Sequence, residues 1–334
     1  MRPPNMQDVA ALAGVSQRTV SNVVNNYVHV SDQTRKKVQD AIQELGYRPN
    51  IAAQRLRSGR TGMIALAVPN ISWPYFGELA HLIQKEAQKY DQTLLITETE
   101  GMRERELKSL EGFRPDVVDG VIYSPIVLTG QELPKIDVPL VLLGEKISDI
   151  GVPHFAVDGE AAGKAITEHL LERGARRFVV VGSSETVMTI GPGPQRRRGI
   201  EKALEEKGLS LTPDCVVESP WTYEGAHGAL TSWLTTHDLP DAIIALNDIA
   251  AAGSVRALAD IGAHVPDDVM VTGWDDTDVA SYTLPSLTTI SPDKVAIARQ
   301  SVKALMELIE IGNTDCGEER VDFELVVRES STRR

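Results

Sequence analysis

The sequence predicts an all-α helix-turn-helix head followed by a larger α/β core of two lobes, each built on a doubly wound parallel sheet. Apolar residues recur at helical spacing over roughly the first 45 positions. From Met63 onward, short β-branched runs alternate with helical segments, as in a parallel sheet covered on both faces. The alternation restarts after Asp158. A chain of 334 residues is therefore expected to form a head and two similar lobes.

Two short helices around a tight turn are predicted first. The apolar spacing of residues 6–13 indicates a helix capped by Asn5 and ended by Gly14, which can take the left-handed conformation. Ser16 caps a second helix whose valines point inward. Its outer face carries hydrogen-bonding side chains: Gln17, Arg18, Ser21, Asn22 and Asn25. Such a face suits the major groove, where Arg bridges guanine and Asn or Gln bridges adenine.

A third helix is expected from the cap Ser31 to Gly46. Arg35, Lys36 and Lys37 lie in its first turns, where the helix dipole favours acids instead. Contact with a DNA backbone and a plain solvated face are equally compatible with these three charges.

Pro49 and Asn50 break this helix and cap a further helical segment of roughly seven residues, which is marginal alone in water. We expect it to order only against a partner, which DNA could supply. Residues 58–62 have the composition of a linker.

The core elements follow from the alternating pattern. We expect strands over residues 63–69, 93–97, 120–124, 139–144, 178–182, 242–246, 269–274, 286–290 and 323–330. Helices are expected over residues 76–90, 103–113, 161–174, 196–208, 223–237, 249–262 and 292–311.

Charge divides the chain at residue 60. Residues 1–60 hold nine Lys/Arg against four Asp/Glu, a net charge of +5, whereas the remainder holds 25 against 43, a net charge of −18. A basic head on an acidic body predicts contact with DNA phosphates by the head alone.

The sequence also bears on compartment and cofactors. Cys215 and Cys316 are the two cysteines and have no CxxC spacing, and the histidines are scattered. We therefore expect no disulfide, metal or cofactor. No apolar run of about 18 residues and no basic-then-apolar leader occur, so a cytoplasmic chain with no membrane contact is expected.

A ligand of an open α/β sheet lies beyond the carboxyl ends of its strands. At these ends the core gathers aromatic rings beside carboxylates, amides and an arginine, a set that suits a sugar. The candidate effector-binding residues are Asn70, Trp73, Tyr75, Phe76, Ser124, Arg196, Trp221, Asn247, Asp248, Trp274 and Asp275.

Other roles stay open for the polar members of this set. Asn247 and Asp248 could only cap the following helix, Asp275 could form a turn, and Arg196 could be a solvated charge. The loop at residues 191–196 lacks the Gly-Lys-Ser/Thr end of a phosphate loop, so we interpret it as a surface loop; a phosphorylated ligand stays a minor alternative.

The head carries the string Asp8-Val-Ala-x-x-Ala-Gly-Val-Ser-x-x-Thr-Val-Ser-x-Val-Val-Asn25, continued by Gly46-Tyr-x-Pro-Asn50 and Ala53-x-x-Leu56. This extended pattern resembles the N-terminal signature of the lactose/galactose-repressor family of bacterial regulators. The resemblance extends over the core at Val271-x-Gly-Trp-Asp-Asp276 and Leu287-Thr-Thr-Ile290.

The resemblance implies a homodimer that reads a pseudo-palindromic double-stranded operator. Arg18 and Asn22 would be the main base readers. Residues 49–60 would form a hinge helix that places Leu56 as an apolar wedge in the minor groove. The residues implied to contact DNA are Ser16, Gln17, Arg18, Thr19, Ser21, Asn22, Asn25, Asn50, Ala53, Arg55 and Leu56.

For the core the resemblance implies a fold like that of periplasmic sugar-binding proteins. Arg196, Asn247 and Asp275 would contact a carbohydrate effector. The domains would be residues 1–48, 49–60 and 61–330, with a first lobe of 61–158 plus 287–312 and a second of 159–286 plus 313–330. Three departures leave the exact ligand open. Trp73 stands where the family has a small polar residue, Glu145-Lys146 lies near a frequent arginine, and Gly159 replaces a frequent asparagine.

The leading hypothesis is a transcriptional repressor whose operator affinity is controlled by a small molecule, and not an enzyme. A solute-binding protein without a DNA role would need a leader peptide, which is not observed. An α/β enzyme would need a catalytic motif such as HExxH, a P-loop or a Ser-His-Asp order.

Overall fold

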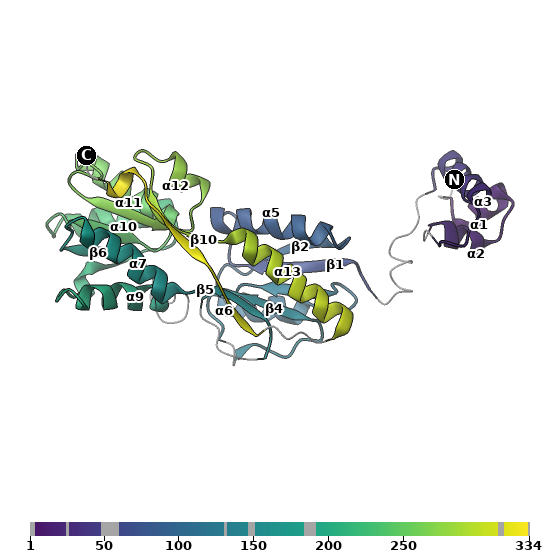
Figure 1. Ribbon diagram of the computed structural model, residues 1–334, viewed down its shortest axis with the longest axis horizontal. Helices are drawn as coiled ribbons and strands as arrows, with labels where there is room; N and C mark the ends of the chain where they lie inside the picture. Colours follow the sequence, from purple (N-terminus) through teal and green to yellow (C-terminus); the bar gives the residue numbers. More distant parts are fainter. Residues whose placement is uncertain are drawn as a thin grey trace. The chain divides into compact units, whose positions relative to one another are not determined.

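Helices form the first of two separately packed units, Met1–Thr61, and two sheets form the second, Gly62–Arg334 (Figure 1). The computed structural model describes residues 4–24, 27–47, 60–129, 132–145, 151–183, 192–312 and 317–332. We refer to the first unit as the head and to the second as the core.

Three helices make up the described part of the head: α1 (Met6–Ala13), α2 (Gln17–Val24) and α3 (Asp32–Leu45). They pack around Val9, Val20 and Val38, which are all fully buried. The apolar stripes predicted from the sequence are therefore the faces that build this small core.

Side-chain caps set the start of each of these helices. The Asn5 carboxamide oxygen accepts hydrogen bonds from the backbone N–H groups of Gln7 and Asp8, and the Asp8 carboxylate accepts one from the backbone of Asn5. Ser16 caps α2 and Ser31 caps α3 in the expected way. Local hydrogen bonding thus fixes the angles between the helices before the core is considered.

Lobe 1 of the core is a sheet of parallel strands in the order β11-β5-β4-β3-β1-β2. Its strands are β1 (Met63–Val68), β2 (Thr93–Glu98), β3 (Gly120–Tyr123), β4 (Leu140–Leu143), β5 (His154–Val157) and β11 (Glu318–Val321). Helices α5 (Pro74–Gln88) and α13 (Lys294–Ile311) pack on one face of this sheet and α6 (Arg103–Gly112) on the other.

Lobe 2 is a sheet in the order β12-β10-β9-β8-β6-β7, parallel except for β12. Its strands are β6 (Phe178–Ser183), β7 (Val216–Glu218), β8 (Ala242–Ala245), β9 (Met270–Trp274), β10 (Thr288–Pro292) and β12 (Phe323–Val326). Helices α7 (Gly159–Glu172) and α9 (Gly193–Glu205) cover one face, and α10 (Tyr223–Leu234) and α11 (Asp248–Asp260) the other. The short α12 (Asp278–Tyr282) and the 3₁₀ turns Pro213–Cys215 and Glu329–Ser331 complete it.

The chain passes between the lobes at three places in the described residues: after β5, after β10 and after β11 (Figure 1). This corrects two sequence expectations. Strand Thr288–Pro292, which we expected in lobe 1, pairs with β9 in lobe 2, and Glu318–Val321, which we expected in lobe 2, pairs with β5 in lobe 1. The reason is that a strand's neighbours depend on long-range pairing, which its own sequence does not specify.

Strands β5, β7 and β11 and helix α12 were not expected from the sequence. Each is only three to five residues long, too short to show a periodic pattern. In the part of the chain that the structure describes, no helix has both the length and the apolar character needed to cross a bilayer.

Candidate functional site

The outer face of α2 is a candidate DNA-contacting surface. Ser16, Gln17 and Arg18 are exposed, whereas Val20 and Val23 on the opposite face are buried. Three further predicted contact residues on the same element are partly exposed: Thr19, Ser21 and Asn22. The predicted contacts Asn25, Asn50, Ala53, Arg55 and Leu56 lie outside the described residues, together with the predicted hinge helix over 49–59.

The basic residues at the start of α3 differ in their surroundings. The Arg35 guanidinium donates to the backbone carbonyl of Tyr27 at 2.9 Å and so fastens the loop between α2 and α3. Lys36 and Lys37 are exposed. Arg35 thus has a structural partner, and the two lysines are placed to meet solvent or a phosphate.

A cavity of about 960 Å³, including its open mouth, lies between the two lobes of the core. Both lobes contribute walls, because the carboxyl ends of their parallel strands face this space. Nine of the predicted effector-binding residues line it: Trp73, Tyr75, Phe76, Ser124, Arg196, Trp221, Asn247, Asp248 and Asp275.

Two predicted effector residues lie elsewhere. The Asn70 carboxamide oxygen accepts from the backbone N–H and the hydroxyl of Ser72, which makes it a turn former before α5. Trp274 is fully buried and lies beneath Arg196, whose guanidinium carbon is 4.2 Å from the centroid of the indole. Neither side chain belongs to the cavity wall.

Arg196 is held from all sides. Its Nε is 3.0 Å and its Nη2 2.5 Å from Glu145 Oε1, and its Nη1 donates to the Leu246 carbonyl. Trp274 and Trp221 lie against the guanidinium. The pair joins the lobes, because Glu145 follows β4 of lobe 1 and Arg196 lies on α9 of lobe 2.

Both charges of this ion pair are largely withdrawn from solvent: the Arg196 and Glu145 side chains are 8% and 7% exposed. Burial raises the pKa of Glu145, and Arg196 opposes that rise. The pair in this position requires a glycine at residue 159, since a Cβ there would overlap with Oε2 of the Glu145 carboxylate. The sequence interpretation of Arg196 as a solvated charge is therefore wrong.

Asp275 lies on a loop with unusual backbone angles. Its φ is 108° and that of Asp276 is 47°, both in the left-handed region that non-glycine residues rarely adopt. Lys294 of lobe 1 donates to the carbonyls of both residues, at 3.0 and 2.9 Å, and also pairs with Glu78. The loop is thus fastened across the gap between the lobes.

The Asp275 carboxylate itself has no hydrogen-bond partner among the described residues, although it lines the cavity. Burial raises the pKa of its carboxyl group well above the usual range, with Arg196 opposing and Asp248 adding to the effect. A partly buried carboxyl group that has no partner in the protein is available to hydrogen-bond a ligand hydroxyl.

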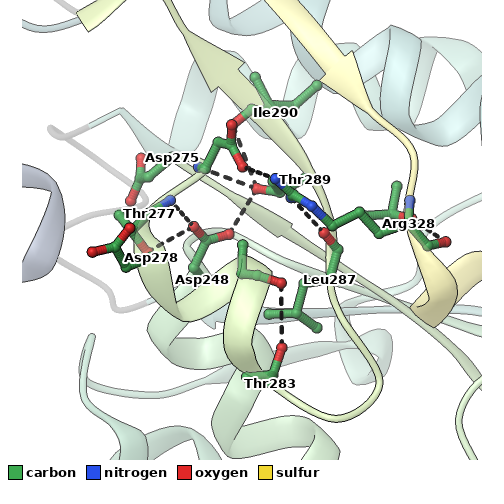
Figure 2. A network of polar contacts seen from close by, with 12 residues as sticks. Asp248, Asp275, Thr277, Asp278, Thr283, Leu287, Thr289, Ile290 and Arg328 are labelled. Carbon is green, nitrogen blue, oxygen red and sulfur yellow. Dashed lines mark hydrogen bonds and ion pairs between the residues drawn. The ribbon is translucent and has the colours of Figure 1, made fainter.

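Asp248 lines the cavity and also makes hydrogen bonds within the protein. Its carboxylate accepts from the backbone and hydroxyl of Thr277 and from the hydroxyl of Thr289 (Figure 2). Burial raises its pKa to about 6, against the effect of these hydrogen bonds. Asp248 therefore ties the start of α11 to β10 and to the loop that carries Asp275.

Asn247 combines both roles that the sequence left open. Its carboxamide oxygen accepts from the backbone N–H of Ala250 at 2.7 Å and caps α11. The amide nitrogen donates to no partner within the described ranges, so it is left for a ligand in the cavity.

Aromatic rings form another part of the cavity wall. The ring centroids of Trp73 and Trp221, from opposite lobes, are 5.6 Å apart, and Tyr75 packs edge-on against Phe76. Burial raises the pKa of the Tyr75 phenol, and the charges of Asp275 and Glu145 raise it further. Tyr75 is thus a hydrogen-bond donor at neutral pH.

The sequence did not predict several apolar residues of the cavity wall. Some lie on short strands that were not expected, and for others the sequence does not show which side of the element faces the cavity. These apolar wall residues are Ile126, Phe155, Ala156, Val157, Pro192, Ile249, Pro292 and Ile297. Nor did the sequence predict the role of Glu106, a fully buried acid whose carboxylate accepts from the backbone N–H groups of Ile126, Val127 and Leu128. Glu106 thereby holds the loop that carries part of the wall.

No group of histidine, cysteine and acidic side chains suited to a metal ion occurs in the described residues. The polar groups of the cavity instead alternate donors and acceptors around aromatic faces, which is an arrangement for binding a polyhydroxylated molecule.

Comparison with known proteins gives the same two-part organisation. Residues 5–50 match the family described as bacterial regulatory proteins, lacI family, and residues 167–331 match a periplasmic binding protein-like domain. The chain is 32% identical to the ribose operon repressor of Halalkalibacterium halodurans over 326 residues, which covers 98% of this chain and 96% of the relative.

Two solved structures extend this likeness to the fold. The lac repressor dimer bound to operator and the anti-inducer ONPF has a TM-score of 0.87 at 27% identity, covering 99% of this chain and all of that one. The transcriptional regulator CelR in complex with cellobiose has a TM-score of 0.72 at 27% identity, covering 98% and 99%. The chain therefore belongs to the lacI family of bacterial transcriptional regulators, with a DNA-binding head and an effector-binding core.

Proposed function

We propose that this chain is a dimeric repressor whose grip on an operator is set by a sugar bound between the lobes of the core. The observation that carries the proposal is the cavity itself: the Asp275 carboxylate, the Asn247 amide and the Tyr75 phenol line one space beside the rings of Trp73 and Trp221. Sugars combine hydroxyls that need paired donors and acceptors with CH faces that stack on rings. The relatives that control ribose genes or bind cellobiose support the same ligand class.

For the head, we propose that Arg18 and Asn22 read base edges, that Gln17 contributes a third base contact, and that Ser16, Thr19, Ser21 and Asn25 contact phosphates. One α2 face offers too few base contacts for useful specificity. Two heads on a pseudo-palindromic site would double them, which is the argument for a homodimer.

We further propose that residues 49–60 form a hinge helix over the minor groove, with Asn50, Ala53, Arg55 and Leu56 at the DNA. The domain limits then follow as 1–48, 49–60 and 61–330. A cytoplasmic regulator without enzymatic activity is the matching assignment for the whole chain.

The effector acts by differential binding to two arrangements of the lobes. A sugar that hydrogen-bonds to Asp275 of lobe 2 and stacks on Trp73 of lobe 1 can make both contacts only when the lobes are close together. Such a ligand stabilises the closed arrangement by the difference between its two affinities. Coupling of this kind changes the affinity at a distant site by about 5–150-fold.

The test starts from duplexes selected from genomic DNA by the purified full-length protein. Operator affinity is then measured by fluorescence anisotropy while sugars that bind the core, identified by calorimetry, are added. We expect a shift of about 5–150-fold with a binding sugar and none with Asp275→Asn, which should bind the duplex normally. A sugar that binds the core without moving the operator affinity would defeat the regulatory part of the proposal.

The same samples separate the alternative classes. A sugar recovered chemically unchanged after long incubation argues against an α/β enzyme, and a selected duplex with a clear preferred sequence argues against a pure solute-binding protein.

A further inference from the structure

Helix α5 begins at a large aromatic residue that lines the cavity. Its N-cap is Trp73, with φ −73° and ψ 122°, and no side chain caps the helix. Helices α6 and α9 also begin without a side-chain cap, at Met102 and Pro192. Six other helices begin at polar residues whose side chains accept from the backbone: α1, α3, α7, α10, α11 and α13. An indole cannot accept such a bond, whereas Asn, Ser or Asp could. A residue that breaks a local rule in this way often serves the function of the site.

The Trp73 indole packs on both lobes at once. The partly buried indole packs against an apolar core of lobe 1 and against an apolar core of lobe 2. Within lobe 1 its ring lies 6.1 Å from Phe76, and across the gap it lies 5.6 Å from Trp221. Trp221 is itself fixed, since its indole N–H donates to the Gly182 carbonyl. Trp73 therefore closes the cavity against a rigid opposing ring.

The space that remains is small. The volume open to the centre of a water molecule is about 80 Å³, which is room for about six waters. That is room for a ligand of about the size of one sugar ring.

The charged residues of the cavity wall also restrict which ligands can bind. Among the described residues that line the cavity, Glu145, Asp248 and Asp275 are acidic and Arg196 is the one basic residue. Arg196 is already paired with Glu145. A phosphate group would therefore lie among carboxyl groups, and the described wall residues leave no unpaired cation to bind it. This argues against the phosphorylated ligand that the sequence left open.

From these observations we infer that Trp73 is the specificity-determining residue of the site, closing it against Trp221 over a single unphosphorylated sugar ring. The inference rests on the proposed function, because it narrows the class of effector. It also explains why a tryptophan occupies a position where a small polar residue would cap the helix better.

Calorimetry on the full-length protein tests this with D-ribose, D-xylose, D-glucose and D-galactose against cellobiose, lactose, D-ribose 5-phosphate and D-glucose 6-phosphate. We expect at least one monosaccharide to bind at least tenfold more tightly than either disaccharide and than either sugar phosphate. Trp73→Asn should lower the preference over the disaccharides at least tenfold and leave the core folded, because Asn caps α5. Trp73→Phe, which keeps a ring, should largely preserve it.

The outcomes are distinguishable. A disaccharide or sugar phosphate bound as tightly as every monosaccharide, or a preference unchanged in Trp73→Asn, overturns the role of Trp73 while sugar binding stands. Absence of binding by all eight compounds overturns the proposed function and this inference with it.

A ligand-free measurement accompanies this. Two close indoles whose planes are inclined to each other, here by 46°, give an exciton couplet in the far-ultraviolet circular dichroism, so Trp73→Phe and Trp221→Phe should remove the same signal. A couplet that survives either change overturns the closing contact.

Discussion

At Arg196 the demands of folding and of binding meet in one side chain. A guanidinium withdrawn from water is costly unless its donors are paired, and here Glu145 and the Leu246 carbonyl take part of them. The pair crosses from one lobe to the other, so it also fixes the distance between the cavity walls. Arg196 therefore presents to the cavity a guanidinium that is fixed in place and whose charge is already paired.

Glu145→Gln tests the importance of this pairing. It leaves the Arg196 charge buried without its counter-charge, so we expect the free energy of unfolding of the core to fall by about 3 kcal/mol. Urea denaturation followed by tryptophan fluorescence measures it. The matched control is Glu86→Gln, which removes the partner of Lys89 on the surface and should cost less than about 1 kcal/mol. Equal losses of unfolding free energy in the two variants would show that the buried ion pair stabilises the core no more than the surface pair does.

Asp248 predicts a pH dependence. Its folded pKa of about 6 lies above the ordinary value of 3.8, so the folded state binds the proton more tightly than the unfolded state. The contribution of Asp248 to stability is therefore greatest below about pH 4 and declines as the pH rises through 6, by on the order of 2 kcal/mol.

Asp248→Asn should flatten this decline in a comparison of unfolding free energies from about pH 4 to about pH 7. The amide oxygen can still accept from Thr277, while the Thr289 hydroxyl can turn to the Ile290 carbonyl, so the fold is kept. Parallel pH profiles for the wild type and the variant would refute the assignment.

At the scale of the element, capping and apolar spacing set the head. Helices α1, α2 and α3 occur where the sequence predicts them, with caps at Asn5, Ser16 and Ser31. Local signals suffice there because each helix buries a single stripe. They fail for β5, β7 and β11, where three or four residues carry no period and pairing partners far along the chain decide.

Asn5→Ala removes both hydrogen bonds that the Asn5 carboxamide oxygen accepts from the backbone N–H groups of Gln7 and Asp8 at the start of α1. We expect the head to lose about 1 kcal/mol of stability, measured by the chemical shifts and thermal melting of head residues in the full chain. Gln7→Ala, on the same exposed turn, is the control and should leave the melting unchanged. An unaltered melting temperature for Asn5→Ala would mean that the cap is dispensable.

The outer face of α2 makes a separate prediction about DNA. Arg18→Ala and Asn22→Ala should each weaken binding to the selected operator by about 1–3 kcal/mol and relax the preference at one base position. Binding to unrelated duplexes should change little, since phosphate contacts dominate it. Gln39→Ala on α3 serves as the control in the same anisotropy assay. Uniform loss on all duplexes would instead identify these residues as phosphate contacts.

At the scale of the whole molecule, charge and tryptophan content separate the two units. The basic residues 1–60 contrast with the acidic remainder, and all four tryptophans lie in the core. Fluorescence therefore reports the core alone, and the electrostatic attraction of DNA belongs to the head.

A sugar that binds the core at 100 times its Kd should stabilise it by about 2.7 kcal/mol. We expect the tryptophan-detected transition to move upward and the head resonances to melt as before. A head transition that moves equally would show that the two units unfold together, against the division at Thr61 and Gly62.

The sequence by itself determined the head helices, the alternation of strands and helices in the core, and most polar residues at the strand ends. These depend on spacing and capping within a few residues. Only the tertiary structure decided that β10 and β11 join the lobes opposite to those expected, that Glu145 pairs with Arg196, and that Lys294 pairs with Glu78, 216 residues away. The physical reason is that periodicity is a local property of the chain, whereas strand order and ion pairing depend on which distant segments folding brings together.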